Sequence, residues 1–312
     1  MSRSAAHKKN RRKWSSTAVF SLAFVVCIVV FGVVGVWFVS RMHTADGNRT
    51  AGLSAGSPES GVADPRLFSD ADAQSLLLIT TLENEAQNFL VLRLDPADTE
   101  IQVASLPRET AATVGTQTAR LFELYGKGTR TEIAQVQQAV GAVLHTEINH
   151  YAVATYDEVE EIVAYCGDQL VFTIPEEMHY TDADSAYLRL SPGEQILSGI
   201  QVANVLRYPV TYWSGGHAQH TRIPAELFSA LIDQNLTPDG EKSGDAVFKD
   251  LVNLLSSNDL LISHYYQAQD ALAYLAEKNE GEICRVVSIE GEYVGTGDAL
   301  AFYPAEILSY FS

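Results

Sequence analysis

The body of the chain carries short apolar runs of strand length, several of them bounded by turn residues. Asp95-Pro96 follows the second run and Pro107 follows the third, as is typical where a strand gives way to a turn. The runs predict strands over residues 76–79, 89–94, 101–106, 150–154, 170–174 and 283–289.

Between and after these runs, apolar residues recur at the three- and four-residue spacing of an amphipathic helix. Thr129 with Glu132, and Thr155 with Glu158, have the spacing of a capping box. Pro224 suits the first position of a helix. The pattern predicts helices over 130–144, 156–166, 194–206, 224–232, 247–255 and 271–278, and a short final helix after Pro304. Strands that interleave with helices predict a layered α/β domain.

An uncharged, proline-free run of 22 residues, 18–39, precedes this body. At about 1.5 Å per residue it spans about 33 Å, enough to cross a hydrocarbon core of about 30 Å. Arg41 follows almost at once, which favours an uncleaved anchor over a cleaved signal peptide. We therefore expect a basic tail over 1–13, a transmembrane helix over 14–42, a flexible stalk over 43–74 and a folded domain over 75–312.

Charge is distributed very unevenly along the chain. Residues 1–42 hold seven Lys and Arg and no acid, so the positive-inside rule places the N-terminus in the cytoplasm and the body outside. Residues 43–312 hold the other 14 basic residues and all 39 acids, a net charge of −25. A body this acidic repels a phosphate backbone, so we expect no nucleic-acid partner.

Standard catalytic signatures are absent: the sequence has no Walker loop, no nucleophile elbow and no H-E-x-x-H pair. His217 with His220, and Asp182 with Asp184, are too few for a complete metal site and are more typical of polar loops. The body has two cysteines, Cys166 and Cys284, which leaves one disulfide or two separate thiols open.

Arg108 is the first residue that indicates a chemistry. It follows the strand predicted over 101–106, after a proline that fixes the turn. In α/β sheets, ligands bind beyond the carboxyl ends of strands, and a planar guanidinium is well suited to phosphate. An arginine in a surface turn is the alternative.

The sequence Ser-Leu-Pro-Arg-Glu-Thr at 105–110 resembles the Ser-Ile-Pro-Arg-Asp-Thr signature of the LytR-CpsA-Psr family. Neighbouring segments agree in order. Residues 190–199 are similar to the family's Leu-x-x-Gly-x-x-x-Leu-x-Gly turn and helix, and 206–208 to its Val-Arg-Tyr. The resemblance extends over 75–312, the whole body.

This resemblance implies a membrane-anchored phosphotransferase of the cell envelope. Such proteins move a glycopolymer from a polyprenyl pyrophosphate lipid onto peptidoglycan, usually with Mg²⁺. The implied fold is a mixed central β-sheet between helices in three layers, with a long apolar pocket for the lipid tail, after one transmembrane helix. The implied partners are the lipid-linked glycan, peptidoglycan and the cell membrane.

The family's catalytic positions are only partly kept. In the family, Arg-Ser-Asp-Thr precedes the second strand. At these positions this chain has Glu85 in place of the arginine and Gln87 in place of the metal-binding or catalytic aspartate. We align the family's Gly-Arg-x-x-Arg-Gln block with 221–226. The resemblance then implies a pyrophosphate clamp of Arg108, Arg207 and Arg222, with Arg120 as a stand-in. Glu83, Glu85 and Glu109 are the acids that could replace the aspartate.

Three functions remain open from the sequence. The first is a working glycopolymer transferase, and the second a catalytically impaired relative that only binds lipid-linked glycan or a wall-assembly partner. The third is an external sensing domain unrelated to the family. The loss of the aspartate together with two clamp arginines favours the second. We expect Arg108, Arg207 and Arg222 to converge at one mouth of an apolar pocket.

Overall fold

The computed structural model describes residues 68–181, 187–238 and 244–311. The expected tail and transmembrane helix, nearly all of the stalk, and the pair Asp182 and Asp184 lie outside these residues. Within the described ranges, no helix is both long enough and apolar enough to cross a bilayer.

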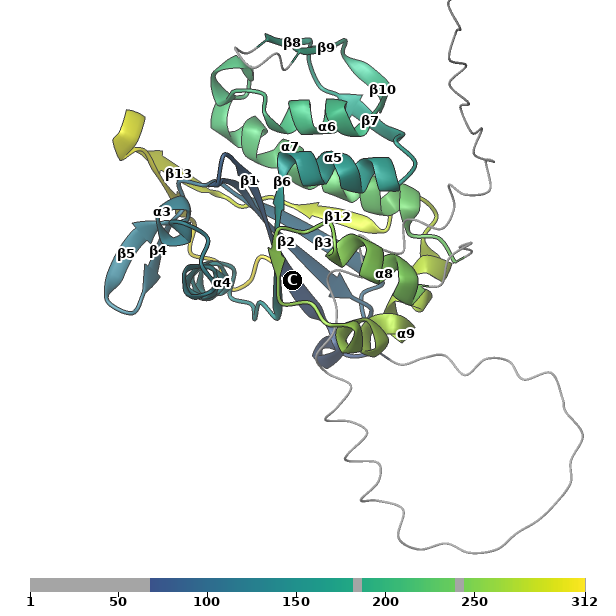
Figure 1. The fold of residues 1–312 in the computed structure, drawn as a ribbon. Helices are drawn as coiled ribbons and strands as arrows, with labels where there is room; N and C mark the ends of the chain where they lie inside the picture. The colour runs from purple at the N-terminus through teal and green to yellow at the C-terminus, as the bar shows by residue number, and fades with distance from the viewer. Residues whose placement is uncertain (1–67, 182–186, 239–243, 312) are drawn as a thin grey trace, which may run out of the picture.

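A six-stranded mixed sheet forms the centre of the domain (Figure 1). Its central strands β1, β2 and β3 are antiparallel neighbours, whereas β6 runs parallel to β1 and β12 parallel to β3. The strands, in spatial order, are β11 (Ser257–Asn258), β6 (His150–Thr155), β1 (Gln74–Leu82), β2 (Glu85–Asp95), β3 (Glu100–Leu106) and β12 (Cys284–Val287).

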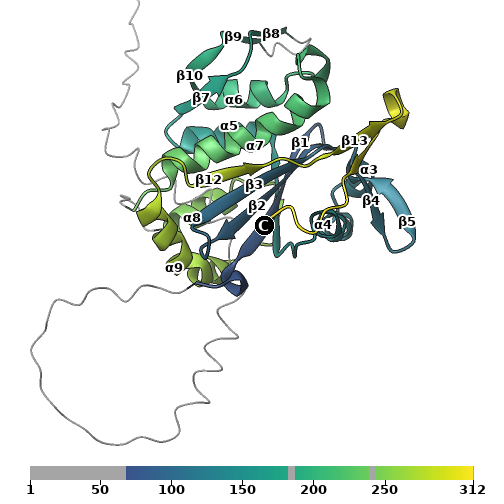
Figure 2. The ribbon, with the colours of Figure 1, turned by 180° about the vertical axis from the view of Figure 1, so that it is seen from behind.

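Helices cover both faces of this sheet, as Figures 1 and 2 show from opposite sides. One face packs against α3 (Leu121–Tyr125) and α4 (Arg130–Leu144). The other packs against α5 (Tyr156–Tyr165), α6 (Gly199–Leu206), α7 (Gly216–Asn235), α8 (Gly244–Val252) and α9 (Ile262–Lys278). The domain is therefore the three-layer α/β arrangement that the sequence predicted.

Alternation along β1 explains why the sequence shows an unbroken apolar run. Leu76 and Leu78 pack into the core on the α5 side, whereas Leu77 and Ile79 pack into the core on the α4 side. Because both faces are covered, both sets must be apolar. The same holds for β2, where Phe89 lies on the α4 side and neighbouring Leu90 on the α5 side.

Four small two-stranded sheets and three short 3-10 helices complete the domain in the described residues. The strand pairs are β4 (Ala111–Val114) with β5 (Gln117–Arg120), β7 (Leu170–Ile174) with β10 (Gly193–Leu197), β8 (Met178–Thr181) with β9 (Tyr187–Leu190), and β13 (Gly291–Val294) with β14 (Ala301–Pro304). The 3-10 helices are η2 (Asp70–Asp72), η3 (Val210–Tyr212) and η4 (Gly297–Ala299).

Both predicted capping boxes are confirmed. The Thr129 hydroxyl accepts a hydrogen bond from the backbone N–H of Glu132, and the Thr155 hydroxyl accepts one from Glu158. In each pair the glutamate carboxylate accepts from the threonine backbone in return. These caps satisfy backbone donors that a helix N-terminus otherwise leaves unpaired, and they fix where α4 and α5 begin.

Several helix predictions were wrong in their bounds or their type. The helix predicted over 271–278 begins at Ile262, as α9, and the one predicted over 247–255 begins at Gly244 and ends at Val252, as α8. Residues 193–197 form β10, because they pair antiparallel with β7, and only α6 follows after Ser198. Pro224 lies inside α7, which begins at Gly216. In the described residues after Pro304 there is no helix, and Pro304 ends β14 instead. Tertiary pairing decided the strands, and α7 tolerates a proline at the loss of one backbone hydrogen bond.

Cys166 and Cys284 are both in the thiol form and are not joined by a disulfide. Cys166 lies in the core, where burial raises the pKa of its thiol to about 12. Two separate thiols were one of the two alternatives that the sequence left open, and this one holds.

Candidate functional site

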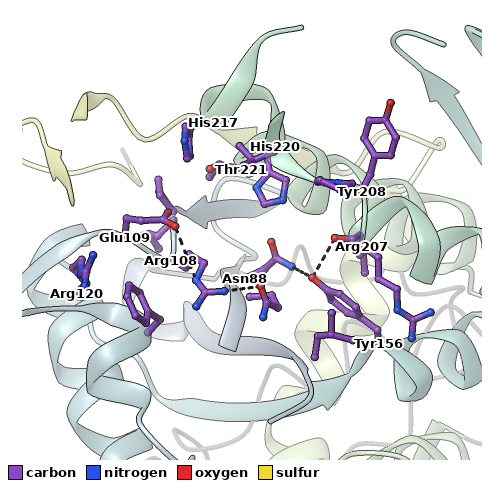
Figure 3. Close-up of a pocket in the computed structure, with 18 of the residues that line it drawn as sticks. Asn88, Arg108, Glu109, Arg120, Tyr156, Arg207, Tyr208, His217, His220 and Thr221 are labelled. Carbon is purple, nitrogen blue, oxygen red and sulfur yellow. Dashed lines mark hydrogen bonds and ion pairs between the residues drawn. The ribbon is translucent and has the colours of Figure 1, made fainter. Parts of the chain in front are cut away.

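A cavity of about 610 Å³ lies beyond the carboxyl ends of β1, β3 and β6, beside the first turns of α7 (Figure 3). These three strands run in the same direction, so their carboxyl ends meet at one edge of the sheet. This is the position at which open α/β sheets bind ligands. The charged and imidazole side chains that line it are Arg108, Glu109, Arg120, Arg207, His217, His220 and Asp298.

Arg108 lies on the cavity wall just after β3, as the sequence predicted. Its Nη1 donates a hydrogen bond to Oε1 of Gln87 at 2.7 Å. Its carboxylate neighbours are farther away, with Glu85 at 3.7 Å and Glu109 at 3.9 Å. The guanidinium also lies over the ring of Phe122, 4.7 Å from its centroid. Within the described residues, one short hydrogen bond engages Arg108, and its other N–H donors remain available to an anion.

The four acidic or degenerate positions named from the sequence do not share one environment. Gln87 lines the cavity and bonds Arg108, so the neutral amide occupies the place expected for an aspartate. Glu109 also lines the cavity, and its side chain is only 20% exposed. Glu85 is 72% exposed, and Glu83 is exposed in the β1–β2 turn with a positive φ of 52°. Of the three possible replacement acids, Glu109 is the one placed at the cavity.

Arg120 lines the cavity as well, but protein acceptors occupy much of its guanidinium. It donates to the backbone carbonyls of Asp298 and Leu300 and to the carboxylate of Glu123. The bond to Glu123 raises the pKa of Arg120 further above its ordinary value. These bonds tie β5 to the loop before β14, and Arg120 lies over the Phe122 ring that also meets Arg108.

Arg207 lines the other end of the cavity, directly after α6. Its guanidinium pairs with Asp157 at 2.7 Å and donates to Asn204 at 3.2 Å. In Figure 3 it extends past the Tyr156 ring, away from Arg108. Arg207 and Arg108 therefore belong to one cavity, with Tyr156 between them.

A buried hydrogen-bond network forms the floor between these arginines. Asn88 donates to Thr80 at 2.8 Å and to the Tyr156 hydroxyl at 3.1 Å, and that hydroxyl donates to the carbonyl of Leu206 at 3.2 Å. Burial raises the pKa of Tyr156 well above its ordinary value, so the hydroxyl keeps its proton. The network joins β1, β2 and α5 to the end of α6, and so positions Arg207.

The expected convergence of three arginines is wrong for Arg222. Its side chain is 66% exposed, pairs with Glu226 one turn along α7, and lines a neighbouring cavity of about 480 Å³ instead. The residues that α7 presents to the arginine-lined cavity are His217, His220 and Thr221. Consecutive helix positions differ by about 100°, so Arg222 faces away when these three face inward.

His217 and His220 are the site residues that sequence reasoning missed. The sequence predicts a polar loop for this segment, whereas both residues lie on the first turns of α7. Residues 216–221 read Gly-His-Ala-Gln-His-Thr, so a glycine and two basic residues have the spacing of the Gly-Arg-x-x-Arg-Gln block. This spacing is the sequence signal for both histidines. It supports aligning the family's block with residues 216–221 instead of 221–226.

The two histidines have different surroundings. His217 packs against the Tyr293 ring at a centroid distance of 4.8 Å. Figure 3 shows the His220 ring pointing into the cavity between Arg108 and Tyr208. Burial lowers the pKa of His220 to about 4, with smaller contributions from His217 and Arg108. The His220 imidazole is therefore neutral at pH 7 in the ligand-free protein.

Metal ligands are sparse around this cavity. Its lining includes two carboxylates, Glu109 and Asp298. Across the described ranges, no group of three or more His, Cys, Asp or Glu side chains is arranged to hold a metal ion. Mg²⁺ is usually held by one or two carboxylates together with substrate phosphates, so Glu109 and Asp298 are the side chains that would hold the ion that the resemblance implied.

The long apolar pocket that the resemblance implies is reduced to a small cavity in this structure. An apolar cavity of about 30 Å³ lies between the sheet and helices α5, α7 and α8. It is lined by Leu76, Leu78, Leu92, Ile162, Phe228, Leu251 and Leu255. A lipid chain is far larger than this volume, so the helices would have to move apart to admit one.

The family model of LytR_cpsA_psr matches residues 70–279 of this chain. The chain belongs to the LytR_cpsA_psr family. The match covers the central sheet except β12, and it contains all the arginines of the site. Comparison with curated proteins gives no match.

Solved structures share the fold of this LytR_cpsA_psr domain at low sequence identity. A protein from Eubacterium siraeum is 15% identical with a TM-score of 0.64, over 82% of this chain and 95% of that one. TagV of B. subtilis is 16% identical with a TM-score of 0.58, over 75% and 91%. TagT bound to LI-WTA is 12% identical with a TM-score of 0.56, over 81% and 93%.

Proposed function

We propose that this protein binds a polyprenyl-pyrophosphate-linked cell-wall glycopolymer through its diphosphate group. The observation that carries the proposal is one cavity with Arg108, Arg120 and Arg207 in its lining, beyond the carboxyl ends of three strands. Guanidinium groups bind phosphate through paired, charge-assisted hydrogen bonds. TagT, which has the same fold, was solved with LI-WTA, a wall teichoic acid, and this supports a glycopolymer as the ligand.

Arg108 is the main ligand in this proposal. Its one short hydrogen bond goes to a neutral amide, and its carboxylate neighbours lie beyond hydrogen-bond distance. A diphosphate can therefore displace weak ion pairs rather than strong ones. Arg120 contributes charge from a fixed position, and Arg207 can join only by leaving the exposed carboxylate of Asp157.

The expected segment 14–42 completes this proposal as a membrane anchor. It places the domain outside the cytoplasm, at the membrane where polyprenyl lipids are held. The lipid tail would follow the apolar cavity between the sheet and α8, which must widen to receive it. Family membership removes the alternative of a sensing domain unrelated to the family.

Transfer of the glycopolymer to peptidoglycan is the second function, and one observation favours it. Glu109 lines the cavity with its carboxylate 3.9 Å from Arg108, where it can accept a proton from an attacking hydroxyl. The loss of the aspartate at Gln87 favours binding without fast transfer. Mg²⁺ stays an expectation of the resemblance, and no step proposed here runs through a metal.

Binding and transfer can be tested on the same full-length protein. We expect geranylgeranyl pyrophosphate to bind in calorimetric titration, and the transfer of labelled lipid-linked glycopolymer to peptidoglycan to be slow. The Glu109→Gln variant should bind at least as tightly, because a carboxylate beside Arg108 is removed. If the wild type transfers glycopolymer at a measurable rate and this variant does not, Glu109 is the catalytic residue of the transfer reaction. Absence of diphosphate binding would contradict the proposal.

A further inference from the structure

Two histidines project from one face of α7 into the arginine-lined cavity. His217 and His220 are three residues apart on the helix, a spacing that places side chains on the same face. Neither ring forms a hydrogen bond to another residue in the part of the chain that the structure describes. The ring nitrogens therefore remain available to a ligand in the cavity.

The net charge of the cavity depends on these two residues. Three arginines and two carboxylates line it, which leaves a net charge of +1 when both histidines are neutral. With both histidines protonated, the same lining carries +3. A diphosphate diester carries two negative charges, so the histidines decide whether the cavity can neutralise it.

The charged groups that line the cavity with His220 come from several elements, and Arg108 and His217 are the ones that act on its pKa. Arg108 and Glu109 follow β3, Arg120 ends β5, Arg207 follows α6, and Asp298 lies in η4. Tyr156 and Tyr208 also line the cavity, and burial raises the pKa of the Tyr156 phenol. His217 lies one turn away on α7 itself, against the ring of Tyr293.

Without ligand, this environment disfavours a charged imidazole. Burial and the nearby positive groups lower the pKa of His220 to about 4. A bound diphosphate reverses the local charge, because it places negative oxygens beside the ring and offsets Arg108. An opposite charge within a few ångströms favours the protonated form of histidine.

We propose that His217 and His220 bind the diphosphate as imidazolium ions, so that ligand binding takes up protons and strengthens as the pH falls. This inference rests on the proposed function and adds to it a dependence on the acidity outside the membrane. Arginines at these two positions would bind the same group at any pH. By linkage, each proton taken up on binding makes the affinity rise about tenfold for every unit by which the pH falls.

The test is a titration of the full-length protein with geranylgeranyl pyrophosphate between pH 5.5 and 8. Three proteins are compared: the wild type, a His217→Arg, His220→Arg variant and a His217→Gln, His220→Gln variant. The ligand's own titration is the same for all three, so differences between their pH profiles report on the histidines. His145→Arg, which adds a charge at the exposed end of α4, is the matched control.

We expect the wild type to approach the arginine variant at pH 5.5 and the glutamine variant at pH 8. The arginine variant should show no pH dependence beyond that of the ligand, and the control should follow the wild type. A wild-type profile parallel to that of the glutamine variant would overturn this inference and leave the proposed function intact. Absence of binding to the wild type at every pH would overturn both.

A measurement on the wild type alone guards against variants that fail to fold. Calorimetry at pH 6 in two buffers of different ionisation enthalpy gives the number of protons taken up with the ligand. We expect the wild type to take up more protons than the ligand's own ionisation supplies. An uptake fully explained by the ligand would contradict the role of the histidines.

Discussion

At the scale of single residues, Arg108 is the side chain on which the proposed binding depends most. We expect Arg108→Gln to weaken binding of geranylgeranyl pyrophosphate by roughly 10- to 150-fold, because hydrogen bonds to a charged group contribute about 1.5–3 kcal/mol. Arg222→Gln is the matched control, since Arg222 lies on α7 but lines the neighbouring cavity. Calorimetric titration measures both. Equal losses in the two variants would show that the charge of the whole domain, and no specific site, attracts the ligand.

Variants at Glu85 and Gln87 test whether the substitutions at these two positions caused the loss of glycopolymer transfer. We expect Gln87→Asp with Glu85→Arg to raise the rate of glycopolymer transfer, because the pair restores the charges that the family resemblance implies. A single contact made in the transition state contributes about 10²- to 10³-fold in rate. The assay follows labelled glycopolymer onto peptidoglycan. Fast transfer by the unchanged protein would show that Glu109 or another group already replaces the aspartate.

At the scale of secondary-structure elements, the Asn88–Tyr156–Leu206 network holds α5, α6 and the sheet in register at the cavity. We expect Tyr156→Phe to lower the free energy of unfolding by about 1–3 kcal/mol, because it leaves the buried Leu206 carbonyl without its partner. Tyr165→Phe on the same helix removes an exposed bond to Asp250 and should cost less, because water can replace that bond. Urea unfolding monitored by circular dichroism compares the two. A larger loss for Tyr165→Phe would contradict the role of the network.

The start of α7 shows how an element and a site depend on each other. Residues 216–222 lack a regular apolar pattern, because one side of this helix faces a polar cavity rather than the core. Helix prediction from apolar spacing therefore began at Pro224 and missed the first turns. The same turns present His217 and His220 to the ligand.

At the scale of the whole molecule, the orientation across the membrane remains a prediction. We expect residues 18–39 to span the bilayer with residue 44 onward outside. In a background with Cys27, Cys166 and Cys284 replaced, a membrane-impermeant maleimide on intact cells should label Ser57→Cys. It should not label Ser4→Cys until the cells are lysed. The opposite pattern would remove the cell-envelope function entirely.

The sequence by itself determined most strands of the central sheet, two helix caps and several residues of the site, Arg108 first among them. The strands β1, β2, β3 and β6 were visible because burial on both faces makes each an unbroken apolar run. The caps of α4 and α5 could be predicted from the sequence because each depends on two residues only three positions apart. Arg108 could be placed because a signature of six consecutive residues surrounds it.

Only the tertiary structure decided what depends on distant segments. Strand β10 exists because β7 offers it hydrogen bonds, and its own residues suit a helix equally well. The direction in which α7 faces turned Arg222 outward and His220 inward, because two residues on a helix differ in direction by about 200°. Which of Glu83, Glu85 and Glu109 lines the cavity depends on where the chain after β3 meets α7 and β2. Sequence spacing fixes contacts within an element, whereas the cavity is formed by elements up to about 200 residues apart.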